Sequence, residues 1–94
     1  MTREVRLSVR ARIDLERLVD FLFDKSPGAA KRARANLAKA LKSLEDLADR
    51  GRPGPSPDLR EIPVRFGRSA YVIQYRVEAD RVIVAHIFHA LEGG

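Results

Sequence analysis

The sequence predicts an α+β domain with the element order β-α-α-β-β-β. Three observations lead to this prediction: a short alternating run near the N-terminus, a 3.6-residue apolar repeat over residues 11–50, and three alternating runs between residues 59 and 89. The 94 residues are enough for one domain, which we expect to span residues 1–94. In the expected arrangement an N-terminal strand and a helical hairpin pack on a small, mainly antiparallel four-stranded sheet.

The N-terminal half supplies the first strand and the first helix. Residues 4–9 alternate with period two, which predicts a strand that turns Val5, Leu7 and Val9 inward. The period then changes to that of a helix, whose apolar residues lie within about 100° of one face. These residues are Ala11, Leu15, Leu18, Val19 and Leu22.

A second helix should begin at Ser26 and Pro27, because serine is a good N-cap and proline suits the first helical position. It should run to about residue 50, where Gly51 fits the C′ position that ends a helix. Alanines in its apolar stripe would let the two helices approach closely, as an antiparallel hairpin.

The C-terminal part supplies the remaining strands. The proline- and glycine-rich residues 51–57 predict an irregular crossover loop, and strands are expected over residues 59–64, 70–77 and 81–88. Pro63 should lie at a strand end or on an unpaired edge, because it cannot donate to a ladder. The middle strand should turn Tyr71, Ile73, Tyr75 and Val77 to one face, and we interpret its two tyrosines as core residues rather than base-stacking residues. In the last strand we expect Val82, Val84, His86 and Phe88 on one face and Ile83, Ala85 and Ile87 on the other, which indicates an interior strand.

The charge of the chain is concentrated in its second half. Arginine and lysine number 18 against 13 acidic residues, and from Arg50 to Arg76 six arginines face only two acids. The guanidinium group suits bidentate contact with carboxylate or phosphate, so we expect an anionic partner, either nucleic acid or an acidic protein segment. The predicted partner-binding residues form one cationic patch on the sheet and its entry loop: Arg52, Arg60, Arg65, Arg68 and Arg76.

Several function classes are excluded. The absence of cysteine excludes disulfides and thiol catalysis, and two histidines without cysteine do not make a zinc site. No metal, cofactor or phosphate-cradling glycine loop is expected. No apolar run approaches the roughly 20 residues needed to span a bilayer, so we expect a cytoplasmic protein without a membrane partner.

This order of elements resembles the RelE/ParE superfamily of bacterial toxins. The resemblance rests on sequence pieces in the right order, among them ARIDL at residues 11–15, SPGAA at 26–30, GRP at 51–53, LRE at 59–61, YVIQYRV at 71–77, and VIV at 82–84 leading to His89. It implies the toxin of a type II toxin–antitoxin pair, held inactive by a cognate antitoxin. Members of the ParE branch poison DNA gyrase, whereas members of the RelE branch cut messenger RNA on the ribosome.

The residues favour the ParE branch. RNA cleavage through the 2′-hydroxyl needs a base, an acid and a cation on the phosphate. In the RNA-cutting relatives a basic residue follows the tyrosine of the middle strand, but here that residue is Val72. The remaining catalytic candidates are Glu61 as base and His89 as acid, with Arg60, Arg65 and Arg68 as phosphate clamps. The alternative interpretations are a surface or capping role for His89 and a hydrogen-bonded core role for His86.

Three functional hypotheses follow. The favoured one is a ParE-like toxin that binds gyrase without chemistry of its own. The second is a RelE-like, ribosome-dependent messenger RNA endoribonuclease that uses His89 with Arg60 or Arg65. The third is a non-catalytic basic module that binds nucleic acid. We further expect the antitoxin to be an acidic, partly disordered peptide that adds to a free sheet edge or fills a groove of the helical hairpin.

Overall fold

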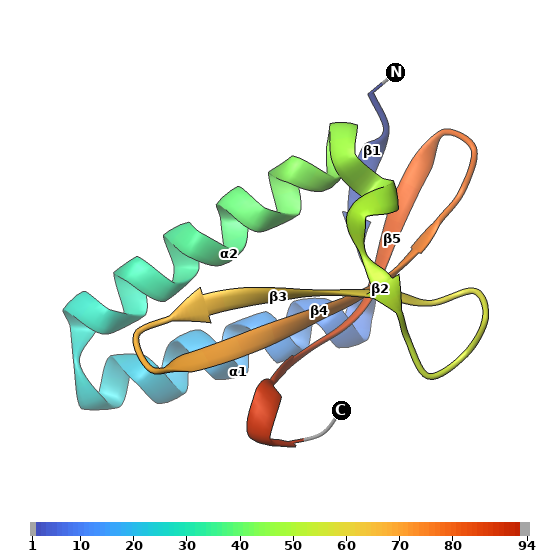
Figure 1. The fold of residues 1–94 in the computed structure, drawn as a ribbon. Coiled ribbons are helices and arrows are strands. Elements are labelled where there is room, and N and C mark those ends of the chain that lie inside the picture. The colour runs from blue at the N-terminus through green and yellow to red at the C-terminus, as the bar shows by residue number, and fades with distance from the viewer. Residues whose placement is uncertain (1, 93–94) are drawn as a thin grey trace.

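The computed structural model describes residues 2–92 and shows two helices packed on one face of a five-stranded sheet (Figure 1). The predicted α+β class and the order of the main elements are confirmed. The elements are β1 (Glu4–Leu7), α1 (Val9–Lys25), α2 (Pro27–Leu47), the 3-10 helix η1 (Ala48–Arg50), β2 (Arg52–Pro53), β3 (Arg60–Phe66), β4 (Ser69–Val77), β5 (Arg81–His89) and the 3-10 helix η2 (Ala90–Glu92).

The sheet has the strand order β1-β5-β4-β3-β2, in which β1 runs parallel to β5 and the other neighbours are antiparallel. The last long strand, β5, is therefore an interior strand, as predicted. The short strand β2 was not predicted, because the sequence indicated an irregular loop there. Arg52 and Pro53 nevertheless pair with Glu61 and Arg60. Pro63 lies in the part of β3 beyond this pairing, in agreement with the expected unpaired edge.

Two N-caps set the start of the helices. The Ser8 hydroxyl accepts a hydrogen bond from the Ala11 amide at 3.0 Å, so the first strand ends at Leu7 and α1 begins at Val9. The expected inward strand position of Val9 is wrong, because Val9 is the first helical residue and is 75% exposed. The predicted cap of the second helix is confirmed, since the Ser26 hydroxyl accepts from the Ala29 amide at 3.2 Å.

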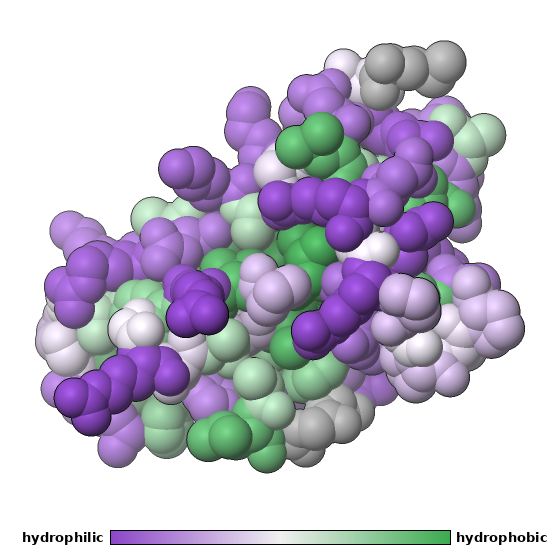
Figure 2. Space-filling view, in the orientation of Figure 1, coloured by the Kyte–Doolittle hydropathy of each residue, from purple (hydrophilic) through white to green (hydrophobic). Residues whose placement is uncertain are grey.

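The core lies between the helices and the sheet. Small buried residues such as Ala11 and Ala33 allow the helices to approach each other, and β4 and β5 supply most of the opposing layer. In Figure 2 a band of hydrophobic residues shows between α2 and the β3–β4 hairpin, with hydrophilic side chains on both sides. The largest side chains that are fully buried are Tyr75, Leu37, Leu44, Ile73, Ile87, Val82 and Val84.

Tyr75 closes the core at the end of α2. Its ring is fully buried, and its hydroxyl donates to the Ala48 carbonyl at 2.7 Å. Burial raises the pKa of Tyr75, against the lowering effect of a backbone hydrogen bond and of Arg60 and Arg50. Tyr71 is also buried, which confirms that both tyrosines are core residues.

Gly51 is required by close approach rather than by a left-handed conformation. Gly51 follows η1, as expected of a residue that ends the helix, but its φ of −67° is not the left-handed conformation that glycine often supplies there. Instead, a Cβ at this position would overlap the Tyr75 hydroxyl and lie 2.9 Å from the Arg60 Cβ. The helix also ends differently from the prediction, because residues 48–50 tighten into η1.

A β-bulge in β5 changes which side chains share a face. Gln74 pairs with His86 and Tyr75 pairs with Val84, so Ala85 is an extra residue in β5. Beyond the bulge the alternation reverses, because paired residues on neighbouring strands point to the same face. The prediction that Val84, His86 and Phe88 share one face is therefore wrong.

Replacing Gly51 by alanine should test the tight approach of Tyr75. We expect Gly51→Ala to lower the free energy of unfolding by about 1–3 kcal/mol, because the new methyl group overpacks the site. Urea denaturation followed by circular dichroism measures this change.

Gly28→Ala is the matched control, because a Cβ there meets the flexible end of Arg32 at 3.3 Å and Ser26 Oγ at an ordinary 3.9 Å, and alanine favours the helix. The Tyr75→Phe background should relieve part of the Gly51→Ala loss, since the overlapping hydroxyl is absent. Equal losses for Gly51→Ala in the two backgrounds would contradict this account.

Candidate functional site

The helices cover one face of the sheet, which we call the helix face, and we call the opposite face the open face. At the edge of β5, α1 also reaches His86 on the open face. The registers assign residues to the open face, because residues paired across strands share a face and alternate along each strand. This open face carries Glu61, Pro63 and Arg65 of β3, Val72, Gln74 and Arg76 of β4, and Ile83, His86 and Phe88 of β5.

One row of the open face is polar. The Gln74 amide donates to Glu61 Oε2 at 2.9 Å, and Arg52 Nε lies 3.7 Å from Glu61 Oε1. His86 is the register partner of Gln74 on the next strand. The Glu61 carboxylate is therefore already engaged by an amide and a guanidinium group.

The adjacent row is apolar. Pro63, Val72 and Phe88 are register partners across β3, β4 and β5, and Val72 and Phe88 are buried. The Phe88 ring lies 4.7 Å from the His86 ring, measured between centroids. None of these three side chains is cationic, so this row cannot stabilise the negative charge of a bound phosphate.

His89 lies on the helix face, because it pairs with Tyr71. The two rings meet edge to face with centroids 5.5 Å apart, and His89 Nδ1 accepts a hydrogen bond from the Leu91 amide at 3.1 Å. His89 therefore caps the start of η2. It lies on the opposite face of the sheet from Glu61. The structure does not bring these two candidate catalytic residues together.

Asp14 joins α1 to β5. Its Oδ2 accepts from the Ile87 amide at 2.9 Å and lies 2.6 Å from His86 Nδ1. Arg10 Nη2 lies 3.2 Å from His86 Nε2. A guanidinium group can only donate, so Nε2 is the acceptor and the hydrogen of a neutral His86 is on Nδ1, facing Asp14. His86 is buried and hydrogen-bonded, as predicted, whereas Asp14 was missed because its partners are more than seventy residues away along the chain.

The five arginines predicted to form one cationic patch lie in three places. Arg60 is on the helix face, where its Nη1 donates to the carbonyls of Asp49 and Gly51 at 3.1 Å each. Arg52 and Arg76 lie beside the acids Glu61 and Glu78. Arg65 and Arg68 lie at the β3–β4 turn, some 20 Å along β4 from Arg76 at about 3.3 Å per residue. The expectation of a single patch is therefore corrected.

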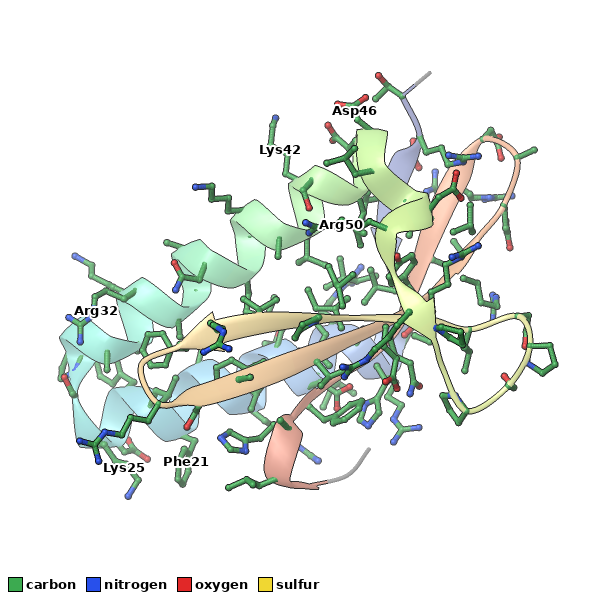
Figure 3. The ribbon with its side chains drawn as sticks, in the orientation of Figure 1. Phe21, Lys25, Arg32, Lys42, Asp46 and Arg50 are labelled. Atoms are coloured by element: carbon green, nitrogen blue, oxygen red, sulfur yellow. The ribbon has the colours of Figure 1, made fainter. Side chains whose placement is uncertain are left out.

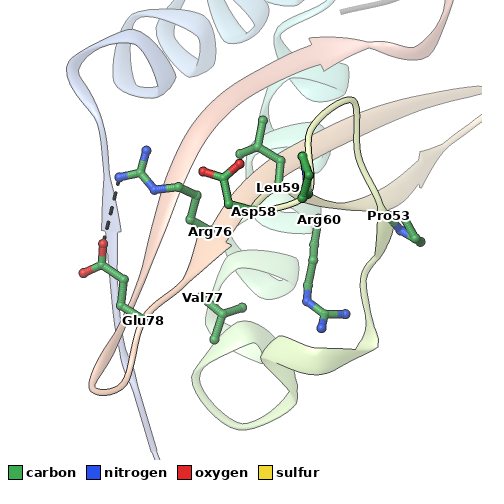
Figure 4. Close-up of a pocket in the computed structure, with 8 residues that line it drawn as sticks. Pro53, Asp58, Leu59, Arg60, Arg76, Val77 and Glu78 are labelled. Atoms are coloured by element: carbon green, nitrogen blue, oxygen red, sulfur yellow. Dashed lines mark ion pairs between the residues drawn. The ribbon is translucent and has the colours of Figure 1, made fainter.

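A small pocket lies between the loop after β2 and the end of β4, and Figure 4 shows its lining. Arg60 and Arg76 contribute positive charge, but Asp58 and Glu78 contribute negative charge, and Arg76 lies 4.0 Å from Glu78 (Figure 4). The opposed charges leave this pocket without a net attraction for an anion.

A larger, mostly apolar groove runs between α1 and the ends of β4 and β5. Its α1 side presents an exposed stripe of Val9, Ile13 and Phe21, together with Arg10 and Arg17. The sheet side is formed by Tyr71, His86, Ile87, Phe88 and His89. We call this groove, of about 1110 Å³, the α1 groove.

The described residues offer neither a cluster of metal ligands nor a membrane-spanning helix. Residues 2–92 hold no group of three or more histidine, cysteine, aspartate or glutamate side chains that could bind a metal ion. Neither helix of this part of the chain has the length and apolar character needed to cross a membrane.

Comparison with known proteins gives consistent matches. Residues 5–93 match the family model described as "ParE toxin of type II toxin-antitoxin system, parDE". Toxin RelE1 of Caulobacter vibrioides is 46% identical over 92 residues, which cover 98% of each chain. Toxin RelE3 of the same organism is 41% identical over 90 residues, covering 96% of this chain and 97% of the relative.

The fold also matches a solved structure. A chain of the "Chromosomal ParDE TA system from P. aeruginosa" superposes with a TM-score of 0.78 and 21% sequence identity, covering 94% of this chain and 96% of that one. At 21% identity this match is evidence for a shared fold alone.

Replacing Asp14 by asparagine should loosen α1 from β5. We expect Asp14→Asn to lower the free energy of unfolding by about 1–3 kcal/mol, because one amide oxygen replaces a charged acceptor that serves two donors. Amide hydrogen exchange should accelerate most at Ile87, which an NMR exchange series measures.

Asp20→Asn is the control, because Asp20 is exposed on the same helix. Similar losses of stability in the two variants, or unchanged exchange at Ile87 in Asp14→Asn, would show that Asp14 does not tie the helix to the strand.

Proposed function

Because the chain belongs to the ParE toxin family of type II toxin–antitoxin systems, we propose that it arrests growth by binding DNA gyrase and trapping the enzyme on cleaved DNA. In this proposal the toxin performs no covalent chemistry of its own, and a cognate antitoxin neutralises it. The observation that carries the non-catalytic part is the apolar row of Pro63, Val72 and Phe88 on the open face.

The placement of the candidate catalytic residues supports a toxin that acts without ribonuclease chemistry. A base and an acid must approach the same phosphodiester from within hydrogen-bond reach, with a cation beside it. Glu61 lies on the open face and is held by Arg52 and Gln74, whereas His89 lies on the helix face. These two groups cannot act on one phosphodiester, and Val72 stands where the cation would be needed.

A second candidate function is a RelE-like messenger RNA endoribonuclease. The observation that favours it is the name of the two relatives, Toxin RelE1 and Toxin RelE3, which align over nearly the whole chain. In this candidate His89 remains the proposed acid and Arg65 the candidate of β3 for the phosphate, since Arg60 donates to backbone carbonyls.

The α1 groove fits the antitoxin. The exposed apolar side chains Val9, Ile13 and Phe21 recur along one side of α1, which suits the apolar face of an amphipathic helix. Arg10 and Arg17 border the groove, and its one acid, Asp14, is already engaged by His86 and Ile87. An acidic amphipathic segment therefore matches both the shape and the charge of the groove. This groove lies between α1 and the sheet rather than within the helical hairpin.

Purified protein should convert gyrase into a DNA-cleaving complex. With gyrase, ATP and supercoiled plasmid, we expect linear DNA to accumulate with increasing protein concentration, because the toxin stabilises the cleaved state. The His89→Ala variant should retain this effect within about twofold, since His89 lies on the helix face, away from the apolar row of Pro63, Val72 and Phe88.

Primer extension on messenger RNA from a translating extract distinguishes the second candidate. Codon-aligned new ends that disappear in His89→Ala, together with unchanged gyrase products, would overturn the gyrase proposal and support the endoribonuclease.

The antitoxin assignment predicts different effects for two neighbouring phenylalanines. Phe21 and Phe23 are 60% and 58% exposed on α1, but only Phe21 lines the α1 groove. We expect Phe21→Glu to weaken antitoxin binding at least tenfold by isothermal titration calorimetry, because a carboxylate would face both the apolar groove and an acidic partner. Phe23→Glu should change the affinity less than twofold. Equal losses in both variants would place the antitoxin elsewhere on α1.

A further inference from the structure

The end of the molecule at the α1–α2 connection is strongly basic. Between residues 25 and 34 the chain has four basic residues and no acid. Lys25 ends α1, and Arg32 lies in the second turn of α2. Figure 3 shows Lys25 and Arg32 at this same end of the helical hairpin, far from Asp46 and Arg50.

The β3–β4 turn adds two more cations to this end. The Asn36 amide nitrogen lies 3.5 Å from the carbonyl oxygen of Arg65, which places the turn beside α2. Asn36 follows Arg32 by four residues, so the two lie one helical turn apart on the same side of α2. Arg68 follows Gly67, whose φ of +59° forms the turn. We call Lys25, Arg32, Arg65 and Arg68, with Lys31 and Arg34 beside them, the basic end.

The side chains of the basic end lack acidic partners. All six are exposed, and among residues 2–92 none of them takes part in an ion pair. By contrast, Arg6, Arg52, Arg76 and Arg81 each lie within 4.0 Å of a carboxylate. Unpaired cations retain their full attraction for an external anion.

Distant acids do not neutralise this charge. The molecule is 39 Å long, whereas charges in 0.1 M salt are screened over about 10 Å. The exposed acids closest along the chain are Asp20 and Asp24 of α1, two against six bases. The basic end therefore presents a net positive surface at physiological salt.

We propose that the basic end binds the phosphodiester backbone of a nucleic acid. Six cations on three rigid segments suit successive phosphates, and the exposed amide of Asn36 adds a neutral donor. An acidic protein would need apolar anchors as well, and the apolar α1 groove lies along α1 instead. This inference does not depend on whether gyrase or messenger RNA is the target. The basic end adjoins the α1 groove at Lys25, whose Nζ lies 4.9 Å from the centroid of the Phe21 ring, and it adjoins the open face at Arg65.

The test compares two triple variants with the same net charge. Arg32→Gln, Arg65→Gln and Arg68→Gln remove the basic end, and Arg6→Gln, Arg76→Gln and Arg81→Gln remove three paired arginines elsewhere. Both lower the net charge of +5 by three. Fluorescence anisotropy with a labelled 20-base-pair DNA duplex, and with an RNA duplex of the same sequence, measures binding between 50 and 200 mM KCl, and circular dichroism checks folding.

We expect the full chain to bind both duplexes, and the basic-end variant to lose at least tenfold in affinity at 100 mM KCl. A plot of log K against log salt has a negative slope, and for this variant the slope should become shallower by about 3. Each phosphate that is no longer neutralised removes roughly 0.9 from the magnitude of the slope. The paired-arginine variant should change less than twofold. If the full chain binds one duplex more tightly than the other, and the basic-end variant still loses at least tenfold in affinity, the result supports the proposal. The preferred duplex then identifies the nucleic acid.

Three results of the duplex experiment would overturn the proposal, and a vesicle experiment adds a fourth. The first is that the full chain does not bind either duplex at 50 mM KCl. The second is that the two variants lose affinity equally. The third is that polyglutamate displaces the labelled duplex as effectively, per charge, as unlabelled duplex does. The last measurement is of binding to vesicles with 30% phosphatidylglycerol. It is needed because Phe21 and Phe23 are exposed near the basic end and could insert into a lipid surface. Tighter binding to vesicles than to duplex, lost in Phe23→Glu, would assign the surface to a membrane instead.

Discussion

The unpaired edge of β5 is the constraint on which the arrangement of this protein depends. β1 ends at Leu7, and beyond it no strand within residues 2–92 pairs with β5 on that side. The start of α1 supplies the missing partners: the Ser8 amide donates to the Val84 carbonyl at 2.9 Å, and the Ser8 hydroxyl donates to the Ala85 carbonyl at 3.1 Å. Asp14 then accepts from the Ile87 amide. Buried backbone groups need such partners, so α1 is fixed to β5 at the bulge.

The bulge decides the chemistry of both faces. With Ala85 as the extra residue, Phe88 joins Val72 and Pro63 on the open face, and His89 stays with Tyr71 on the helix face. A regular β5 would place His89 on the same face as Glu61. A shift of one residue in register therefore decides between two arrangements. One would be compatible with acid–base chemistry, and the other, found here, has an apolar row on the open face. The proposed gyrase-binding function depends on this separation.

Much of the fold follows from local sequence signals. Ser26 followed by Pro27 predicts the boundary between the helices, and the regular alternation of β4 predicts which of its side chains enter the core. The bulge does not follow, because β5 is apolar on both faces and its pattern fits either register. The partners of Asp14 and the clash that requires glycine at position 51 also depend on residues far along the chain. The arginines show the same limit: counting charges along the sequence located the excess on the strands. Register and ion pairs instead show a cluster of cations without acidic partners among residues 2–92 at the α1–α2 connection and the β3–β4 turn.

The most direct test of this account is a set of NOE distances around His89 in the full chain. The account predicts NOEs from the His89 ring protons to the Tyr71 ring, and from the Tyr75 backbone to Val84 across the bulge. NOEs from the His89 ring to the Val72 methyl groups or to the Glu61 side chain would contradict it. They would place His89 on the open face and restore the catalytic arrangement.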